Sequence, residues 1–309
     1  MSCDVSILIV NWNTRDLVLA CLDALPVGID DDLTYEAIVV DNGSVDGSGD
    51  ALAGRDDIVL VRNDDNLGFA AAVNQAYHRA TGEFVLLLNS DVELKPGALS
   101  VLVRFLRQFP NVAGAAPMYV NPDGSPQPFH FRFPTFAMTL ANGSSLVNRL
   151  LPGSERRLRE YRMTDEDFSK PRAVPQPSAS CLLLRSSCLP DPDLLDENYP
   201  IFFNDVKLAR TIATRGLELW VVPEAVVVHE AHSSAKMLGR GPGRRQYLAS
   251  TVRFLSETEQ PAKVWLYRTV VFTQNTALWA LRRPEALHGS ELREALAGDP
   301  GPLPRRPSR

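Results

Sequence analysis

Short apolar runs alternate with segments of helical spacing between residues 5 and 109. The runs are rich in Val, Ile and Leu, which is typical of short strands that are buried on both faces. Parallel neighbours must be joined by a crossover, so this alternation predicts an α/β fold with a mostly parallel sheet and helices on both faces. The predicted strands are 5–10, 35–40, 58–61 and 84–88, and the predicted helices are 15–25, 69–80 and 96–109, with a weaker one before residue 58.

Three of these predicted strands end in polar triplets. The triplets are Asn11-Trp12-Asn13, Asp41-Asn42-Gly43 and Asn89-Ser90-Asp91. In open α/β sheets, ligands bind beyond the carboxyl ends of the strands. We therefore expect the three triplets to meet at one edge of the sheet and to form a polar ligand site there.

Each motif at that edge also has a simpler structural explanation. Asp91 suits a divalent cation that is shared with substrate phosphates, but a turn before Pro96 accounts for it as well. Asp41 is placed to accept a hydrogen bond from a base or a ribose, but a polar turn with a helix cap accounts for the residue without a ligand. Asn66-Leu67-Gly68 and Asn74 accompany a helix start and are weak signals alone. The residues by themselves leave both explanations open.

The second half of the chain is less regular. Residues 119–177 hold many prolines, and helices are predicted there only at 140–151 and 154–161. A loop rich in Gly and Arg is predicted at 237–245. Periodicity returns in the predicted strands 180–185, 217–222 and 225–229, and in the predicted helices 202–215, 246–257 and 262–281.

Two residues of this half suit chemistry. Asp205 stands at a helix start, where the helix dipole favours an ionised carboxylate, and such a group can accept the proton of an alcohol. An N-cap Asp is the structural alternative. His229 follows an apolar strand and has Glu230 and His232 nearby, so its imidazole is a candidate metal ligand. A lone His after a strand is more often structural.

Two basic regions close the candidate set. Lys236, Arg240, Arg244 and Arg245 form a cluster that is either a solvated loop or a mobile clamp for phosphate. The predicted helix 262–281 combines Trp and Phe side chains with nearby arginines. It either packs on the domain or in a homodimer interface, or it touches an anionic bilayer.

Composition excludes some classes of protein. The 309 residues carry a net charge of −5, so nothing indicates a protein that coats nucleic acid. The four cysteines form no C-x-x-C pair and are expected to be reduced thiols in the cytoplasm. The apolar run 264–281 is interrupted by Arg268, Gln274 and Asn275, which makes it a poor membrane span.

Taken in order, four segments of the chain resemble one known family. The segments are "VSILIVNWN", "IVVDNGSVDGS", "NLGFAAAVNQAYHRATGEFVLLLNSDVELKPGAL" and "FFNDVKLARTIATRGLELWVVPEAVVVHEAHSS". They look like the family 2 glycosyltransferases of GT-A fold, and most of all the rhamnosyltransferase-like branch that decorates bacterial surface glycans. The resemblance covers about residues 5–253, and the ordered set is much more specific than any single motif.

The resemblance implies a division of the chain. Residues 1–235 would form the GT-A domain, with a nucleotide-binding half at about 1–118 and an acceptor-binding half at about 119–235. Residues 236–297 would form a C-terminal helical extension. Residues 298–309, rich in Pro, Gly and Arg, are predicted to be a disordered tail.

The resemblance also implies roles for matching residues. Asp41 resembles the acid that reads the nucleotide base and ribose, and Asp91 stands as the metal-binding carboxylate where the family has D-x-D and this branch often has N-x-D. Asp205 matches the general base, and His229 matches a His that contacts the metal or the diphosphate. The nucleotide-sugar set is Asn11, Asn13, Asp41, Asn42, Gly43, Asn66, Gly68, Asn74, Asn89 and Ser90, and weaker candidates for diphosphate or acceptor contacts are Asn204, Ser233, Lys236, Arg244 and Arg245.

Two departures from the family pattern bear on function. Where the family usually reads E-D-x-D, this chain has Asn204-Asp205-Val206-Lys207, which keeps the base but replaces the flanking acids by an amide and an amine. In addition, no Q-x-x-R-W segment follows and no membrane span is predicted. The second departure argues against a processive polysaccharide synthase.

The implied function is an inverting glycosyltransferase. It would move a sugar, with a rhamnose-like deoxyhexose as the expected one, from a nucleotide-diphosphate sugar to a hydroxyl of a glycan or lipid-linked acceptor. Mg²⁺ or Mn²⁺ on Asp91 would stabilise the departing nucleotide diphosphate. The expected place is the cytoplasm, with the inner face of the cell membrane as a peripheral location, and a homodimer stays open.

Two alternatives are kept. A sugar nucleotidyltransferase shares the α/β layout and a metal carboxylate, but it normally has a Gly-rich loop after the first strand, and residues 11–15 contain no Gly. A catalytically impaired relative that still binds nucleotide sugars is supported by Asn204 and Lys207 alone.

Overall fold

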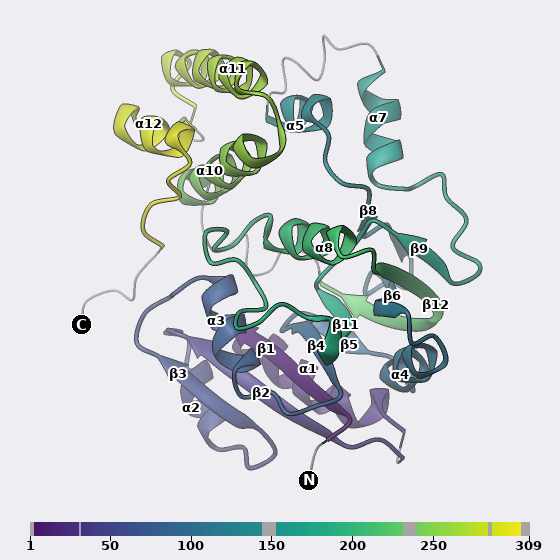
Figure 1. Ribbon diagram of the computed structural model, residues 1–309. Coiled ribbons are helices and arrows are strands. Elements are labelled where there is room, and N and C mark those ends of the chain that lie inside the picture. The colour runs from purple at the N-terminus through teal and green to yellow at the C-terminus, as the bar shows by residue number, and fades with distance from the viewer. Residues whose placement is uncertain (1–2, 31, 144–152, 231–239, 284–285, 304–309) are drawn as a thin grey trace.

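The computed structural model describes residues 3–30, 32–143, 153–230, 240–283 and 286–303. One ten-stranded sheet lies at the centre of these residues, and its main path has the order β3-β2-β1-β4-β11-β6-β12-β5 (Figure 1). The first four strands of this path are parallel, whereas the strands beyond β4 form a mixed region. The ten strands of this sheet are β1 (Val5–Asn11), β2 (Tyr35–Asn42), β3 (Val59–Asn63), β4 (Phe84–Asn89), β5 (Val92–Leu94), β6 (Val112–Val120), β7 (Pro126–Gln127), β9 (Arg172–Val174), β11 (Cys181–Arg185) and β12 (Glu218–His229). A separate two-stranded sheet is formed by β8 (His130–Phe131) and β10 (Gln176–Pro177).

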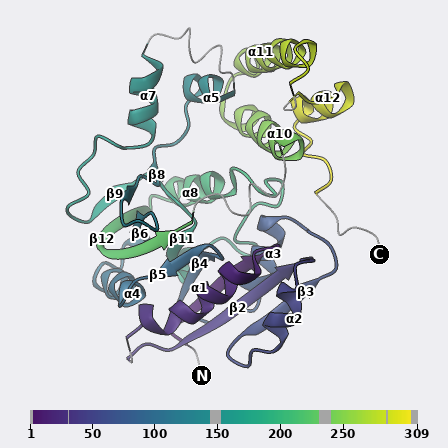
Figure 2. The ribbon, with the colours of Figure 1, turned by 180° about the vertical axis from the view of Figure 1, so that it is seen from behind.

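Helices cover both faces of this sheet (Figures 1 and 2). All α-helices that the structure describes are α1 (Arg15–Gly28), α2 (Ser48–Ala53), α3 (Phe69–Tyr77), α4 (Ala98–Gln108), α5 (Phe136–Gly143), α7 (Ser154–Tyr161), α8 (Asn204–Thr214), α10 (Arg240–Thr258), α11 (Pro261–Ala280) and α12 (Gly289–Ala297). The side chains of Ile7 and Ile9 share one core with α1 and α4, and Leu8 shares the other core with α3 and α8. Successive residues of a strand point to opposite faces, so β1 contributes to both cores, as the apolar runs predict.

The C-terminal helices form a third core. Residues of α10, α11 and α12 pack together with Tyr199, Phe203 and Val206 around the start of α8, and Figure 1 shows this group on the far side of α8 from the sheet. The predicted C-terminal helices are therefore present, and α12 is one that the sequence pattern missed. No helix of the described residues is long and apolar enough to cross a bilayer.

Residues 298–303, which begin the stretch predicted to be disordered, have defined contacts. The Gln246 side-chain amide donates to the carbonyl groups of Pro300 at 3.1 Å and Gly301 at 3.4 Å. Leu303 lies against the loop that contains Gly68. Residues 304–309 lie outside the described residues.

Strand β6 is a second element that the sequence pattern missed. It holds Ala and Gly at four successive positions, 113–116, which is not the composition of a typical strand. The packing explains this composition, because a Cβ atom on Gly114 would lie 2.7 Å from Leu184 and 2.9 Å from Leu219. Strand β6 also crosses the boundary predicted at residues 118 and 119, so the two halves of the domain share it.

The two strands predicted at 217–222 and 225–229 are one strand, β12. Its pairing with β6 shifts register between Val222 and Val226. Pro223 lies at this shift, where a bulge accommodates a residue that has no N–H to donate. The helix predicted at 140–151 begins earlier, at Phe136, and residues 144–152 lie outside the described residues.

Candidate active site

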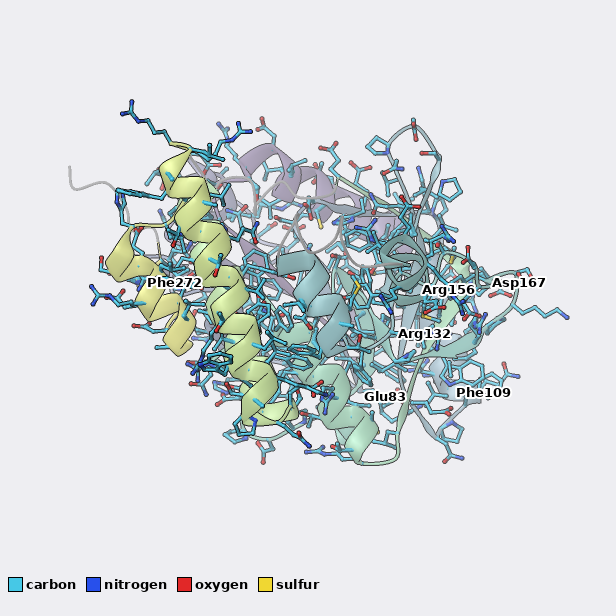
Figure 3. All side chains as sticks on the ribbon, turned by 90° about the horizontal axis from the view of Figure 1, so that it is seen from above. Glu83, Phe109, Arg132, Arg156, Asp167 and Phe272 are labelled. Carbon is cyan, nitrogen blue, oxygen red and sulfur yellow. The ribbon has the colours of Figure 1, made fainter. Side chains whose placement is uncertain are left out.

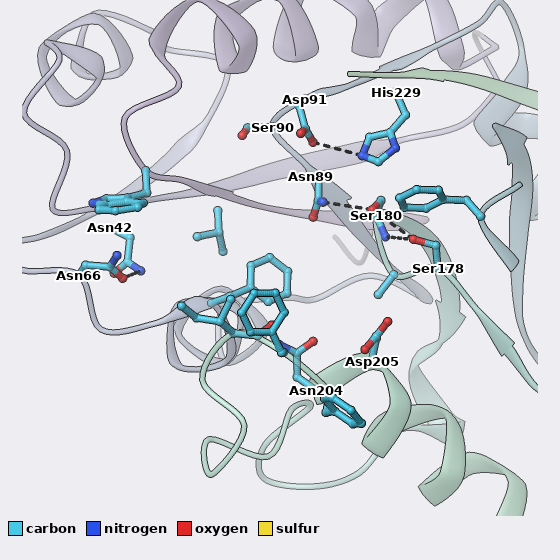
Figure 4. Close-up of a pocket in the computed structure, with 18 of the residues that line it drawn as sticks. Asn42, Asn66, Asn89, Ser90, Asp91, Ser178, Ser180, Asn204, Asp205 and His229 are labelled. Atoms are coloured by element: carbon cyan, nitrogen blue, oxygen red, sulfur yellow. Dashed lines mark hydrogen bonds and ion pairs between the residues drawn. The ribbon is translucent and has the colours of Figure 1, made fainter. Parts of the chain in front are cut away.

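A cavity of about 350 Å³ lies where β4 ends and α8 begins (Figure 4). The carboxyl ends of the parallel strands form one side of it, and the segment 201–205 forms the other. Eight of the residues singled out in the sequence line this cavity: Asn42, Asn66, Asn89, Ser90, Asp91, Asn204, Asp205 and His229. The polar strand ends and the start of α8 therefore meet at one place, although they are distant in the sequence.

Asp91 and His229 face each other at one end of the cavity. Asp91 follows β4, and His229 ends β12, which pairs with β5 directly after Asp91. The distance from Asp91 Oδ1 to His229 Nε2 is 3.6 Å, and the two side chains are only 6% and 2% exposed. This separation is too long for a good hydrogen bond, but it suits two ligands of one ion.

Gln127 fixes the tautomer of His229. The Gln127 side-chain N–H groups donate to Asn121 Oδ1 at 2.8 Å and to the His229 carbonyl at 3.3 Å. Its Oε1 therefore faces His229 Nδ1, at 2.8 Å. A carbonyl oxygen can only accept, so in the neutral ring Nδ1 carries the proton and Nε2 turns its lone pair toward Asp91.

This arrangement fits a divalent cation. A lone pair and a carboxylate oxygen that are buried and face each other are a favourable pair for a positive ion, and imidazole and carboxylate are both ligands of Mn²⁺ and related metals. Within the described residues, no group of three His, Cys, Asp or Glu side chains is placed to hold a metal. An ion here would take its other ligands from substrate oxygens or water, as Mg²⁺ commonly does.

Asp205 lies across the cavity from this pair, in the first turn of α8 (Figure 4). Its Oδ1 accepts from the Val206 N–H at 2.8 Å, and its Oδ2 accepts from Gln176 Nε2 at 3.3 Å. Burial raises the pKa of the Asp205 carboxyl above its ordinary value of 3.8, although these two hydrogen bonds act in the opposite direction. A carboxylate with a raised pKa is a better proton acceptor than an exposed one.

The backbone before Asp205 is strained. Phe203 has a φ of 69°, in the left-handed region that aromatic residues rarely adopt. The Phe203 ring is 7% exposed and packs in the third core with α10. Packing of the C-terminal helices thus holds the turn that directs Asn204 and Asp205 to the cavity.

Asn204 and Lys207, the two departures from the family pattern, both make structural contacts. The Asn204 side chain lines the cavity and donates to the Ile201 carbonyl at 2.7 Å. Lys207 forms an ion pair with Glu257 of α10. Neither side chain hydrogen-bonds to the Asp205 carboxylate.

Amide side chains hold the loop that follows β3. Asn42 Nδ2 donates to Asn66 Oδ1 at 3.0 Å and to the Gly68 carbonyl at 3.2 Å. Asn42 Oδ1 accepts from Asn63 and from the Leu67 N–H. The cavity wall on this side is therefore fixed by hydrogen bonds before any ligand arrives.

Six residues of the nucleotide-sugar set do not line the cavity. Asp41 is 3% exposed, and its Oδ1 accepts from Asn11 Nδ2 at 3.1 Å. Asn13 accepts from the Val45 N–H, and Asn74 exchanges two hydrogen bonds with the Leu195 backbone. These side chains hold the loops that shape the cavity, and the remaining members of the six are Gly43 and Gly68.

The loop predicted at 237–245 is wrong over residues 240–245, and residues 237–239 lie outside the described residues. Arg244 and Arg245 lie inside α10, which begins at Arg240 rather than at 246, because Pro242 is tolerated in the first turn of a helix. Arg244 donates to Asn275 and Arg245 pairs with Glu294, so both are bound to the C-terminal helices instead of a mobile loop. Ser233 and Lys236 lie outside the described residues.

The sequence reasoning missed the aromatic wall and two serines of the cavity. Ser180 lies just before β11, which runs antiparallel to β4, so the start of β11 meets the end of β4. The Ser180 carbonyl accepts from the Asn89 N–H at 2.8 Å, and its hydroxyl accepts from Asn89 Nδ2 at 3.1 Å. A search of strand ends alone overlooks the start of an antiparallel strand. The other missed residues are Phe69, Phe129, Phe131, Ser178, Ile201, Phe202 and Phe203, whereas Trp12 belongs to a polar triplet that was expected at this edge.

A sheet whose first four strands are parallel, with polar strand ends facing a helix start across one cavity, has the architecture of the GT-A fold. Residues 6–188, more than half of the chain, match the family model described as glycosyl transferase family 2. The chain belongs to this family, which removes the nucleotidyltransferase alternative.

A relative of known name and two solved structures are similar to the chain. It is 28% identical over 235 residues to the N-acetylglucosaminyl-diphospho-decaprenol L-rhamnosyltransferase of Mycobacterium tuberculosis, over 71% of this chain and 74% of the relative. The mannosyltransferase PcManGT from Pyrobaculum calidifontis, in complex with GDP-Man and Mn²⁺, superposes with a TM-score of 0.54 at 18% identity over 91% of this chain and 76% of that one. GalNAc-T7 with UDP, GalNAc and Mn²⁺ gives a TM-score of 0.54 at 17% identity over 74% of this chain, which spans 44% of that protein.

Proposed function

We propose that this protein is an inverting glycosyltransferase that uses a nucleotide-diphosphate sugar. The observation that supports it best is the pairing of two features in one cavity. A half-buried carboxylate, Asp205, stands at a helix start, and the buried pair of Asp91 and His229 stands across from it. A single displacement needs a base on the acceptor side of the sugar and positive charge on the leaving-group side, and this placement offers both.

Asp205 is the proposed general base. Its carboxylate accepts two hydrogen bonds, from Gln176 and from the Val206 backbone, which fix its plane. One lone pair on each oxygen is left for an acceptor hydroxyl. As the hydroxyl attacks the anomeric carbon, Asp205 takes its proton, and the sugar is transferred with inversion.

Asp91 and His229 are the proposed ligands of Mg²⁺ or Mn²⁺. When bound, the ion would neutralise charge on the departing nucleotide diphosphate. The two GT-A structures that carry Mn²⁺ support the same choice of ion. Gln127 would hold the imidazole in the tautomer that leaves Nε2 free for the ion.

The donor is proposed to carry a rhamnose-like deoxyhexose. The name of the Mycobacterium tuberculosis relative supports this choice, and so does the cavity wall, because Phe129, Phe131 and Ile201 offer apolar contacts that suit a methyl group. The acceptor is proposed to be a glycan or a lipid-linked saccharide. Asn42, Asn66, Asn89 and Ser90 remain the proposed contacts for the nucleotide sugar.

The proposed place is the cytoplasm, at the inner face of the cell membrane, with no nucleic acid as a partner. The division at about residues 118 and 235 is kept as a functional one, between donor and acceptor binding. Self-association into a homodimer is the competing use of the C-terminal helices.

The competing function is a relative that binds nucleotide sugars without turnover. Its support was Asn204 and Lys207. The contacts of these residues with Ile201 and Glu257 weaken that support, because they account for both side chains without disturbing Asp205.

A panel of nucleotide sugars, each with and without Mn²⁺, tests the proposal by thermal shift. The correct donor at 100 times its Kd should stabilise the protein by about 2.7 kcal/mol. Transfer is then measured with the donor that binds. Binding without release of nucleotide diphosphate, at any acceptor supplied, favours the competing function, and no binding by any nucleotide sugar contradicts both.

A further inference from the structure

Helix α11 exposes a line of large apolar side chains. Trp265, Phe272 and Trp279 are 67%, 53% and 65% exposed, and they are spaced seven residues apart, so they follow one side of the helix. We call these three residues the α11 stripe. Leu266 and Leu281 flank it at 42% and 71% exposure, so α11 and its end hold five of the ten large apolar side chains that are exposed in the described chain. In Figure 3, α11 lies in the nearest layer, with no other helix across it.

The fold does not need this side of α11. An adjacent side of the helix carries Val264, Tyr267, Val271 and Asn275, which are buried against the other C-terminal helices. Asn275 exchanges two hydrogen bonds with the backbone of Leu287, both at 3.0 Å. The helix is therefore anchored by one face, and its other apolar face is free for a partner.

The threonine hydroxyls within the exposed side are already satisfied. The hydroxyl groups of Thr269, Thr273 and Thr276 donate to the carbonyls of Trp265, Thr269 and Phe272 one turn earlier, at 2.9 to 3.0 Å. Removing these threonines from water would thus leave no hydroxyl donor without an acceptor. This lowers the cost of covering the stripe with an apolar medium.

The charge on α11 has one sign. Residues 261–283 contain Lys263, Arg268, Arg282 and Arg283 but no Asp or Glu, in a chain whose net charge is −5. Lys263 pairs with Glu259 of the preceding helix. The three arginines form no ion pair with any residue that the structure describes.

We propose that the α11 stripe docks on an anionic lipid bilayer, with α11 lying in the plane of the headgroups. Trp and Phe side chains would enter the boundary between headgroups and acyl chains, and Arg282 and Arg283 would meet lipid phosphates. No helix of the described chain can span a bilayer, so contact would be at the surface.

A second copy of the chain fits this face less well. An antiparallel pairing of two α11 helices places the Arg282 and Arg283 end of one helix beside Lys263 of the other. The helix offers no carboxylate on which these cations could pair, so the contact would bring like charges together. An anionic surface has the complementary charge along the whole helix.

The docking surface deepens the location given under the proposed function, but its test is independent of the proposed activity, because vesicle binding needs neither a donor nor a metal ion. The test is flotation of the full chain with vesicles of phosphatidylcholine that contain about 30% phosphatidylglycerol, and with vesicles of phosphatidylcholine alone. We expect binding to the anionic vesicles that is at least about tenfold tighter and that weakens with salt.

Paired variants assign the contact. Trp265→Ser with Trp279→Ser should lose at least about tenfold in binding, and Arg282→Gln with Arg283→Gln about thirtyfold, the loss expected for two surface arginines at an anionic bilayer. The matched control is Val27→Ser with Val59→Ser, which removes two side chains that are 53% and 45% exposed on other elements and should bind like the parent. Equal thermal transitions of all variants exclude unfolding as the cause.

Three results would overturn the proposal. In the first, the full chain stays unbound to anionic vesicles at low salt. In the second, the double Trp variant binds these vesicles as tightly as the parent. In the third, light scattering shows a dimer that the double Trp variant converts to a monomer, while neither the parent nor the variant binds to vesicles. The last result would assign the α11 stripe to a second copy of the chain.

Discussion

The two sides of the cavity are built in different ways. On the strand-end side, regular parallel pairing sets Asn11 beside Asp41 and Asn42 beside Asn63. Their side chains are then joined by hydrogen bonds into a rigid frame. On the α8 side, Asp205 depends on a left-handed Phe203 and on Gln176 from a strand of two residues. The first side is organised by the sheet itself, whereas the second depends on packing by the C-terminal helices.

This difference matches what each side would have to do. A nucleotide diphosphate is the constant part of a donor, and a rigid frame suits it because little ordering is left to occur on binding. Short segments held by other elements can vary without disturbing the sheet, which suits the side that would bind the acceptor. The predictions below test whether the strand-end side and the α8 side of the cavity also differ in their roles in catalysis and in stability.

Asp205→Asn should have the largest effect. Asn keeps the shape and one oxygen that can accept a hydrogen bond, but it cannot take a proton. We expect transfer from the bound donor to fall about 10²–10⁴-fold, while donor affinity in calorimetry is unchanged. Asp165→Asn, at a carboxylate whose side chain is 69% exposed, is the control and should keep the parental rate. A variant at Asp205 that keeps most of its rate with saturating acceptor would place the base elsewhere.

Gln127→Leu should weaken metal binding on the strand-end side. Without Oε1, nothing holds the proton on His229 Nδ1, and loss of such a supporting partner typically costs about 10–100-fold in metal affinity. Calorimetric titration of Mn²⁺ in the presence of nucleotide diphosphate measures the change. Gln127→Glu keeps an acceptor for Nδ1 and is the control that should retain affinity. Asp91→Ala should remove the metal dependence of nucleotide binding altogether, and an unchanged dependence would exclude Asp91 from the metal site.

Gly43→Ala tests how closely the strand-end frame is packed. A Cβ atom at Gly43 would lie 2.7 Å from the Asp65 carbonyl carbon, at a φ of +78°. Gly124 has a similar φ of +83° but nothing within 4 Å of its Cβ position. Gly124→Ala should therefore cost only the backbone strain, about 1 kcal/mol, and Gly43→Ala about 2–4 kcal/mol. Equal losses in urea denaturation would show that the loops yield easily.

The same Asp205→Asn variant should be more stable than the parent at neutral pH. Burial raises the pKa of this carboxyl above 3.8. The pKa of Asp205 is higher in the folded state than in the unfolded state, so between these two pKa values the folded state binds more protons. The free energy of unfolding therefore falls as the pH rises through this window, and it stays lower at higher pH. Asn cannot ionise, so its gain in Tm should be present at pH 7 and shrink below about pH 4. A Tm at pH 7 below that of the parent would contradict the burial of this charge.

The sequence predicted the strand-end side far better than the α8 side. The runs that become β1, β2, β3 and β4 each have an apolar stretch followed by a polar end, so pattern alone located them to within a few residues. Strand β6 was missed because Leu184 and Leu219 leave no room for a side chain at Gly114, which is tertiary information.

The site shows the same limit. Asp91, Asp205 and His229 were identified because they belong to motifs in a fixed order. Gln127, Gln176 and Ser180 were not, because each comes from a short or antiparallel strand whose position is set by pairing rather than by its own pattern. Arg245 was misplaced for a local reason, since a Gly- and Pro-containing segment that looks like a loop is the first turn of a helix.

Lys207→Ala should have the smallest effect, and it bears on the competing function. Lys207 lies two residues after Asp205, but its ammonium group pairs with Glu257 of α10, which also accepts from the Tyr199 hydroxyl at 2.9 Å. The side chains of the pair are 33% and 36% exposed, so solvent screens it, and its loss should cost about 0–1 kcal/mol. Transfer should stay at the parental rate, because Glu257 and Lys207 are absent from the residues that line the cavity. A large rise in transfer would mean that Lys207 restrains the base, and a large fall would make it an acceptor contact. Either result would show that Lys207 is more than a structural contact between α8 and α10.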